Sequence, residues 1–179
     1  MTTTEFWKRF NNSYRKVATL GVYDEKRAFE IDSSAPMAIN APQHFLSFVE
    51  KHGCGCCLHY SWALIGELKN NGIEASWAVV PEPRPENPNA QKCVVHYTTP
   101  NGEEFIADPI EDVKAGVTIS SYIGNGCQWV DSCGKIVDNS IFSVNEFAER
   151  EGYLRIYPSP NENEGFLDYH GRTDYREII

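Results

Sequence analysis

The sequence predicts an α+β domain in which one long helix packs against an antiparallel sheet. The helix is indicated by side chains that follow the i, i+4, i+7, i+8, i+11 progression of a single helix face. The sheet is indicated by two alternating runs, 93–98 and 103–108, on either side of Pro100-Asn101-Gly102. Two such runs around a turn of this kind are typical of a β-hairpin. The positions of the helix face are Cys57, Ser61, Leu64, Ile65 and Leu68.

The length of the chain fits one domain. Its 179 residues, of which 41% are apolar, lie within the usual range for a single hydrophobic core. Residues 158–179 are polar and carry five acidic side chains against two arginines. We therefore expect a single domain over residues 1–157, followed by a polar C-terminal extension over residues 158–179.

The net charge restricts the class of partner. Sixteen Lys and Arg stand against 25 Asp and Glu, which gives a formal charge of -9. Such a balance repels phosphate backbones and anionic lipid, so we expect neither a nucleic acid nor a membrane as partner. The sequence contains no apolar run of signal-peptide or membrane-spanning length. We expect a soluble, cytoplasmic protein.

The N-terminal third is expected to contain two helices. Apolar side chains at helical spacing predict the first helix over residues 4–17. Residues 24–41 follow no regular pattern and are expected to be irregular. Pro42 suits the first turn of a second helix that runs to about Lys51, and Gly53 is its stop signal.

The helix that begins at Cys57 leads into the sheet. Gly72 occupies the position at which a helix commonly ends in the left-handed conformation. The alternating run 73–80 then predicts a strand. Residues 81–91 contain four of the ten prolines, so we expect a stiff surface loop there.

The turn of the hairpin fixes which side chains share a face. Proline at the second turn position and glycine in the left-handed region favour a three-residue loop with a G1 bulge. In that register Thr99 faces Glu103, and His96 faces Ile106. The even-numbered residues, including His96 and Asp108, are then expected to form a polar face and the odd-numbered residues an apolar core face.

Shorter elements are expected in the C-terminal half. Short apolar runs between residues 109 and 139 predict further strands of modest length. Ser143, with Glu146 three residues later, predicts a capped helix over residues 143–150. Residues 153–157 are expected to form a closing strand.

A thiol, an imidazole and a carboxylate occur in that order on these elements. Cys57 opens the central helix, where unpaired N–H groups and the helix dipole favour a thiolate. His96 can accept a proton and later return it. Asp108, on the same strand face, is placed to fix the tautomer of the imidazole. We therefore predict a catalytic triad of Cys57, His96 and Asp108.

The same residues carry a resemblance to a known family. The run from Gly53 to Ala75 has a cysteine that opens a helix, a small residue four later, a Leu-Lys pair and then Gly-Ile-x-Ala. Residues 94–97 and 105–109, Val-Val-His-Tyr and Phe-Ile-Ala-Asp-Pro, follow in order. About residues 45–110 therefore resemble the transglutaminase-like core of the papain-like cysteine enzymes.

The resemblance implies a papain-like catalytic domain with Cys57 as nucleophile, His96 as base and Asp108 as orienting acid. It also implies acyl transfer on amide bonds through a thioester, of peptidase, deamidase or transglutaminase type. A protein or peptide substrate is implied, with no cofactor and no metal. Glu74 and Ser76 differ from the residues that are common in the family at these positions, which leaves the substrate class open.

Spacing distinguishes the nucleophile from its neighbours. Cys57 lies fifteen residues before Gly72, as in the family, whereas Cys54 and Cys56 do not. The oxyanion donor stays open, with the Cys57 N–H, Gln43, Gln128 and a Trp indole as candidates. His170, the other histidine considered as base, falls in the polar extension.

A non-catalytic binding module on the same fold, or one that holds zinc, is the alternative. Thiolate and imidazole groups are the ligands that zinc prefers. The spacing of Cys127 and Cys133 is looser than that of common zinc knuckles. The candidate zinc ligands are Cys54, Cys56, Cys57, His59, Cys93 and His96.

Overall fold

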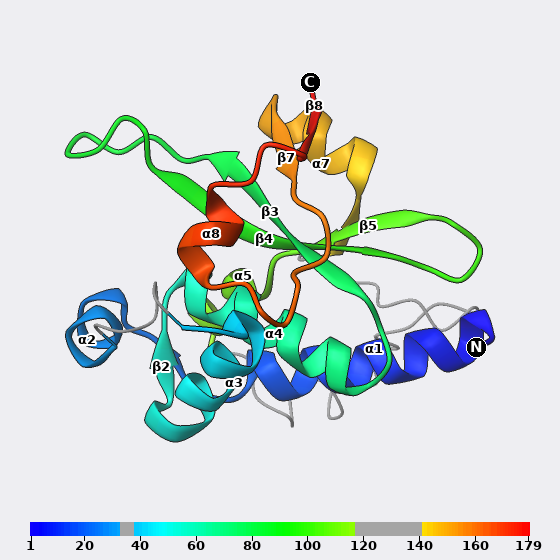
Figure 1. Ribbon diagram of the computed structural model, residues 1–179, viewed down its shortest axis with the longest axis horizontal. Coiled ribbons are helices and arrows are strands. Elements are labelled where there is room, and N and C mark those ends of the chain that lie inside the picture. Colours follow the sequence, from blue (N-terminus) through cyan, green and yellow to red (C-terminus); the bar gives the residue numbers. More distant parts are fainter. Residues whose placement is uncertain (33–37, 117–140) are drawn as a thin grey trace.

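The computed structural model of the chain describes residues 1–32, 38–116 and 141–179. They form a mixed α+β fold around a twisted antiparallel sheet, with the N-terminal helix at one end of the helical layer (Figure 1). The strands predicted within residues 117–123, 128–130 and 135–137 lie outside the described residues, as do Cys127, Gln128 and Cys133.

Within the described residues, the main sheet has six strands in the order β6-β5-β4-β3-β7-β8, and all neighbouring pairs are antiparallel. A separate parallel pair joins two short strands near the start of the central helix. The strands are β1 (Val22–Tyr23), β2 (Cys54–Gly55), β3 (Ala75–Pro81), β4 (Gln91–Thr98), β5 (Glu104–Ala107), β6 (Ile141–Ser143), β7 (Leu154–Ile156) and β8 (Arg176–Ile178).

Most of the predicted helices and strands are confirmed. The helices expected over residues 4–17, 42–51 and 143–150 and the strands expected over 73–80 and 153–157 are present, with ends shifted by one or two residues. The helices are α1 (Thr3–Ala18), α2 (Glu25–Ile31), α3 (Ala41–His52), α4 (Cys57–Asn70), α5 (Pro109–Lys114), α7 (Val144–Glu151) and α8 (Phe166–His170).

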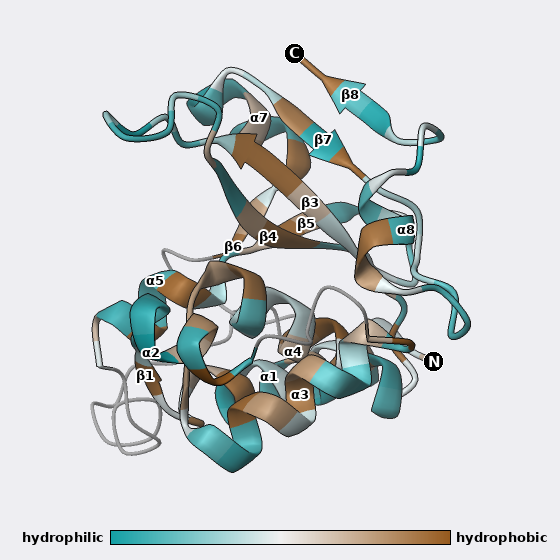
Figure 2. Ribbon diagram, turned by 60° about the vertical axis from the view of Figure 1, so that its left-hand side comes forward, coloured by the Kyte–Doolittle hydropathy of each residue, from teal (hydrophilic) through white to brown (hydrophobic). Residues whose placement is uncertain are grey.

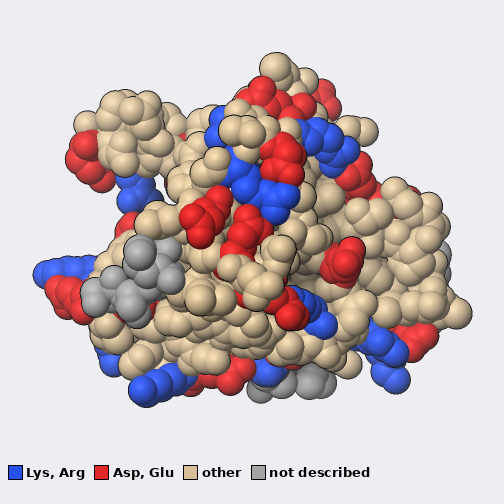
Figure 3. Space-filling view, in the orientation of Figure 1, with Lys and Arg blue, Asp and Glu red and all other residues tan. Residues whose placement is uncertain are grey.

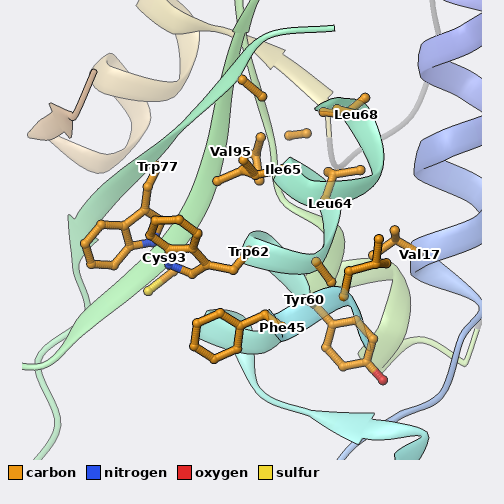
Figure 4. Packing of buried hydrophobic residues seen from close by; sticks show 14 of the residues in the cluster. Val17, Phe45, Tyr60, Trp62, Leu64, Ile65, Leu68, Trp77, Cys93 and Val95 are labelled. Atoms are coloured by element: carbon orange, nitrogen blue, oxygen red, sulfur yellow. The ribbon is translucent and has the colours of Figure 1, made fainter. Parts of the chain in front are cut away.

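Helices cover both faces of the sheet (Figure 2). On one face, α1 and α4 pack against the odd-numbered side chains of β3, β4 and β5, and α3 packs against α4. On the other face, α7 packs against the even-numbered side chains of the same strands. Figure 4 shows Trp62 and Ile65 of α4 beside Trp77, Cys93 and Val95 of the sheet. The sheet therefore separates two apolar cores.

Helix α4 is the centre of the larger core. Every residue from 59 to 68 is buried, which includes all positions of the predicted helix face except Cys57. A Cβ atom at Gly66 would lie 2.5 Å from the carbonyl oxygen of Pro42, so glycine permits the close approach of α3 and α4. Gly72, with φ of +75°, follows the end of α4 as predicted.

The predicted register of the hairpin is confirmed. His96 lies opposite Ile106, and the Thr99 N–H donates to the Glu103 carbonyl at 2.8 Å. Gly102 has φ of +88°, as the bulged three-residue loop requires. The even-numbered residues of β4 and β5 therefore share one face.

The even-numbered face is not the polar surface that the sequence predicts. Val94 and Ile106 are fully buried in the second core, beneath α7. The interpretation was wrong because this sheet is covered on both faces, so one apolar face does not imply that the other is exposed.

Two short helices, α2 and α5, are present that the sequence did not predict. Residues 25–31, within the stretch expected to be irregular, form α2, and Asp24 caps it by accepting from the Arg27 N–H at 3.1 Å. Residues 109–114, which lie before the predicted strands of this region, form α5, with Pro109 in the first turn.

The C-terminal residues 158–179 are part of the fold, which corrects the expected polar extension. Phe166 and Tyr169 of α8 are buried, with ring centroids 5.6 Å from Trp77 and 5.0 Å from Trp62, respectively. β8 adds an edge strand to the sheet by pairing with β7. Two apolar side chains at i, i+3 spacing anchor one helical turn although most of the segment is polar.

Replacement of Phe166 by alanine is expected to lower the free energy of unfolding by about 3 kcal/mol, because a buried aromatic ring is lost from the core. Leu167→Ala is the matched control: this neighbouring side chain is 52% exposed, and its loss should change stability by less than about 0.5 kcal/mol. Urea unfolding followed by tryptophan fluorescence measures both. Equally small effects would show that α8 does not anchor the C-terminal segment.

Among the described residues, no helix is both long and apolar enough to cross a membrane.

Candidate active site

Cys57 is the first residue of α4 and is partly exposed. The other three cysteines of the described chain, Cys54, Cys56 and Cys93, are buried. The first residues of a helix have N–H groups without intrahelical partners, and the helix dipole favours negative charge there. Cys57 therefore combines access with an environment that stabilises a thiolate.

The surroundings of Cys57 favour its ionised form. The thiols of Cys56 and Cys93 and the backbone N–H groups of Cys93 and Leu58 lower the pKa of Cys57 well below its usual range, against the opposing effect of burial. The pKa values of Cys56 and Cys93 are raised, first of all by their hydrogen bonds to Cys57. Of these three neighbouring thiols, Cys57 is therefore the one whose ionised form is favoured.

Cys93 faces Cys57 because it lies on the odd-numbered face of β4, against α4. Ser61, one helical turn after Cys57, donates from Oγ to the Cys93 carbonyl at 2.9 Å. This hydrogen bond connects the start of α4 to the strand and positions the Cys93 thiol.

His96 lies on the opposite face of the sheet, so the structure does not bring the predicted triad together. The residue belongs to the even-numbered face, together with Val94 and Ile106 of the second core. Among the described residues, neither ring nitrogen of His96 contacts Asp108. The predicted imidazole–carboxylate bond is therefore corrected: the register is right, but α4 packs on the other face.

His96 instead joins Ser76 and Glu104. Its Nδ1 lies 3.0 Å from Ser76 Oγ and its Nε2 lies 2.9 Å from Glu104 Oε1. A carboxylate only accepts, so we assign the ring proton to Nε2 and the donor role at Nδ1 to the Ser76 hydroxyl. Burial lowers the pKa of His96, against the opposing effect of its hydrogen bond to Glu104, and Arg176 pairs with that carboxylate.

A pocket of about 480 Å³ lies beside this second polar group. Cys57 and Asp108 are not among its lining residues. Its polar and aromatic lining includes Ser76, His96, Thr98, Tyr157, Asp174 and Arg176. Imidazole and thiolate therefore occupy two distinct places in the fold.

Asp108 is fully buried at the end of β5. Lys92 Nζ lies 2.5 Å from its Oδ2, but neither carboxylate oxygen accepts a hydrogen bond of regular geometry within the described chain. Burial raises the pKa of Asp108 to about 6, although Lys92 lowers it, and the negative charge of Cys57 adds to the rise. Asp108 thus has an ammonium rather than an imidazole as its partner.

Two side chains near Cys57 have roles that were not predicted from the sequence. His59 accepts at Nδ1 from the Cys56 N–H at 3.2 Å, and burial lowers its pKa to about 4, so it is a neutral cap of α4. Its position three residues after the cap is the spacing of a capping box. Lys92 has no sequence signal of its own, because its contact with Asp108 joins two separate strands.

The loop between β3 and β4 leans toward the helix beside the thiol site. Arg84 in this loop lies 3.4 Å from Glu25 of α2, and the Tyr23 hydroxyl donates to the same carboxylate at 3.3 Å. The loop projects from the sheet in Figure 1. Acidic and basic side chains are interspersed on the face in Figure 3, so this face of the described chain has no extended basic surface.

No group of three His, Cys, Asp or Glu side chains in the described ranges is arranged to hold a metal ion. In the sequence, Cys54 and Cys57 have the Cys-x-x-Cys spacing that is found in zinc and redox sites. However, Cys54 lies on β2 with Arg27 and Asp24 as its charged neighbours. The zinc alternative therefore gains no support from these residues.

Comparison of the chain with protein-family models, with curated proteins and with solved structures gave no match. The resemblance to transglutaminase-like enzymes therefore stays a prediction from the sequence.

Proposed function

We propose that the chain is a cysteine-dependent acyl transferase or hydrolase in which Cys57 attacks amide or related acyl carbonyls. One observation carries the proposal: a partly exposed thiol opens a buried helix, where backbone N–H groups and the neighbouring thiols lower its pKa. A sulfur in this environment is ionised and nucleophilic without a neighbouring imidazole.

The proposed reaction proceeds through a thioester. The Cys57 thiolate adds to the carbonyl carbon, and the N–H groups at the start of α4 stabilise the oxyanion. As the C–N bond breaks, the leaving amine takes a proton from Asp108, whose pKa of about 6 keeps both protonation states populated near neutrality. Water or an amine then attacks the thioester and returns a proton to Asp108. His96 has no part in this reaction.

We further propose that the fold is a variant of the transglutaminase-like core. A cysteine that opens a helix, that helix packed on an antiparallel sheet, and the order of β3, β4 and β5 with Asp108-Pro109 after β5 all support this. The variant differs in its base, because Cys93 occupies the strand position that faces the nucleophile.

A protein or peptide substrate in a reducing compartment such as the cytoplasm fits this proposal. The four cysteines of the described chain are free thiols, as is common where glutathione and thioredoxin keep thiols reduced. The contact of Arg84 with Glu25 supports a role for residues 82–90 as one wall of a substrate groove.

Trapping of the acyl-enzyme tests the proposal. The protein is incubated with a panel of activated peptide esters and glutamine-containing peptides, and adducts are mapped after trypsin digestion. We expect added mass on peptide 52–69 at Cys57, removed by neutral hydroxylamine as a thioester is, and retained in Cys56→Ser. An adduct at Cys54 or Cys56, or none in wild type, would contradict the proposal.

The pocket beside His96 favours a second candidate, a non-catalytic module that binds a small ligand there. Convergent polar groups in a concave site are typical of ligand binding. Chemical-shift changes confined to Ser76, His96 and Arg176 in a ligand screen, together with no acyl adduct on any cysteine, would favour this candidate over the thiol enzyme.

A further inference from the structure

We propose that Cys57 and Cys93 form a reversible disulfide by exchange with a low-molecular-weight disulfide such as oxidised glutathione. The loss of activity that would result rests on the proposed function, but the exchange reaction itself does not. The pair would make the candidate active site sensitive to the thiol–disulfide balance of its surroundings.

The geometry of α4 and β4 brings these two thiols together. Cys57 packs against the core cluster that contains Cys93, and each of these two thiols is a cause of the other's shifted pKa. The 2.9 Å bond from Ser61 Oγ to the Cys93 carbonyl holds the strand against the first turn of α4. Only Cys57 of the two is accessible, so an external disulfide meets this sulfur first.

The other described cysteines are less suitable partners. Cys54 is fully buried on β2, and its charged neighbours are Arg27 and Asp24 rather than the Cys57 sulfur. The sulfur of Cys56 lies 3.3 Å from His59 Nδ1 at the cap of α4. Cys93 approaches from a different element, without the constraint of an adjacent peptide bond.

The exchange takes place in two steps that balance. The Cys57 thiolate attacks one sulfur of oxidised glutathione, a Cys57–glutathione bond forms, and the first glutathione leaves as a thiolate. Cys93 then gives its proton to that thiolate and attacks the Cys57 sulfur, which releases the second glutathione as a thiolate. Two protein thiols are oxidised to one disulfide, and one glutathione disulfide is reduced to two thiols.

The first step prepares Cys93 for the second. The hydrogen bond to the Cys57 thiolate is the largest cause of the raised pKa of Cys93, followed by burial. Capping of Cys57 by glutathione removes the negative charge, so Cys93 ionises more readily than in the free protein. The cluster is thus stable when reduced and able to resolve a mixed disulfide.

Incubation in glutathione buffers of increasing oxidised fraction, followed by acid quench, alkylation and trypsin digestion, tests this proposal. We expect a disulfide between peptides 52–69 and 93–114, reversed by excess reduced glutathione. A Cys54–Cys57 disulfide would instead stay within one peptide, and a bond to Cys127 or Cys133 would involve peptide 115–135. Either of these in place of the expected pair would overturn the proposal.

Two variants separate this inference from the proposed function. Cys93→Ser should accumulate glutathione on Cys57 without an internal disulfide, and Cys54→Ala is the matched control that should retain the disulfide. Acylation of wild-type Cys57 without any Cys57–Cys93 disulfide would overturn the redox proposal alone. A Cys57 that forms the disulfide but no acyl adduct would overturn only the proposed acyl transfer.

Discussion

Replacement of Cys57 by alanine is expected to abolish the acyl adduct and to lower turnover of any amide or ester substrate by at least about 10³-fold, because the nucleophile is lost. The fold should remain, since alanine is the best helix former and the lost thiol is only partly buried. Mass spectrometry of trapped protein, steady-state rates and urea unfolding together measure the effect.

Cys54→Ala is the matched control for this prediction. It removes a neighbouring thiol that is fully buried and whose pKa is affected by Arg27 and Asp24 rather than by Cys57, so it should cost stability and leave the adduct in place. Full activity of Cys57→Ala, or loss of activity in Cys54→Ala at a temperature where it is folded, would show that the nucleophile is another group.

Asp108→Asn is expected to raise stability and to lower activity. Because the pKa of Asp108 rises from 3.8 to about 6 on folding, the native state binds its proton more tightly than the unfolded state does. Wild type therefore loses stability as the pH rises from about 4 through about 6, by roughly 3 kcal/mol at about 1.4 kcal/mol per pH unit. Asparagine stays neutral and avoids this loss.

The difference in unfolding free energy between Asp108→Asn and wild type, measured in urea, should be close to zero at about pH 4 and roughly 3 kcal/mol in favour of the variant at about pH 7.5. Amide turnover should fall, because the leaving amine loses its proton donor. Alkylation of Cys57 by iodoacetamide should persist, since it needs no such proton. A variant that is less stable than wild type at neutral pH would show that the Lys92–Asp108 pair is a structural anchor instead.

The elements near the site could be predicted because local signals determine them. The register of β4 and β5 follows from Pro100 and Gly102, whose backbone preferences select the turn. The start of α4 at Cys57 follows from the spacing of apolar residues on one helix face. These interactions span a few residues, so the sequence carries them directly.

The face of the sheet that meets α4 was not inferred, although the sequence holds a signal for it. Helix α4 is apolar, so it packs on the more apolar odd-numbered face, which contains Cys93. His96 lies at an even-numbered position and therefore points to the other side. Because side chains alternate between the two faces of a strand, a shift of one residue along β4 decides whether an imidazole or a thiol faces Cys57.

Contacts between segments that are far apart in the sequence could not be predicted from local sequence patterns. Lys92 approaches Asp108 only because β4 and β5 lie side by side. Phe166 and Tyr169 anchor α8 although the surrounding residues are polar. Both features depend on tertiary packing, which periodicity within one segment does not encode.

The pH dependence of alkylation at Cys57 tests most directly whether this residue is a thiolate without help from an imidazole. Rates of iodoacetamide labelling are measured on peptide 52–69 for wild type and for His96→Ala. We predict rates at about pH 6 within about twofold of those at about pH 8 in both proteins, because the cluster keeps the sulfur ionised throughout this range. An inflection near the ordinary thiol value of about 8.5, or loss of labelling at about pH 6 in His96→Ala alone, would contradict the account.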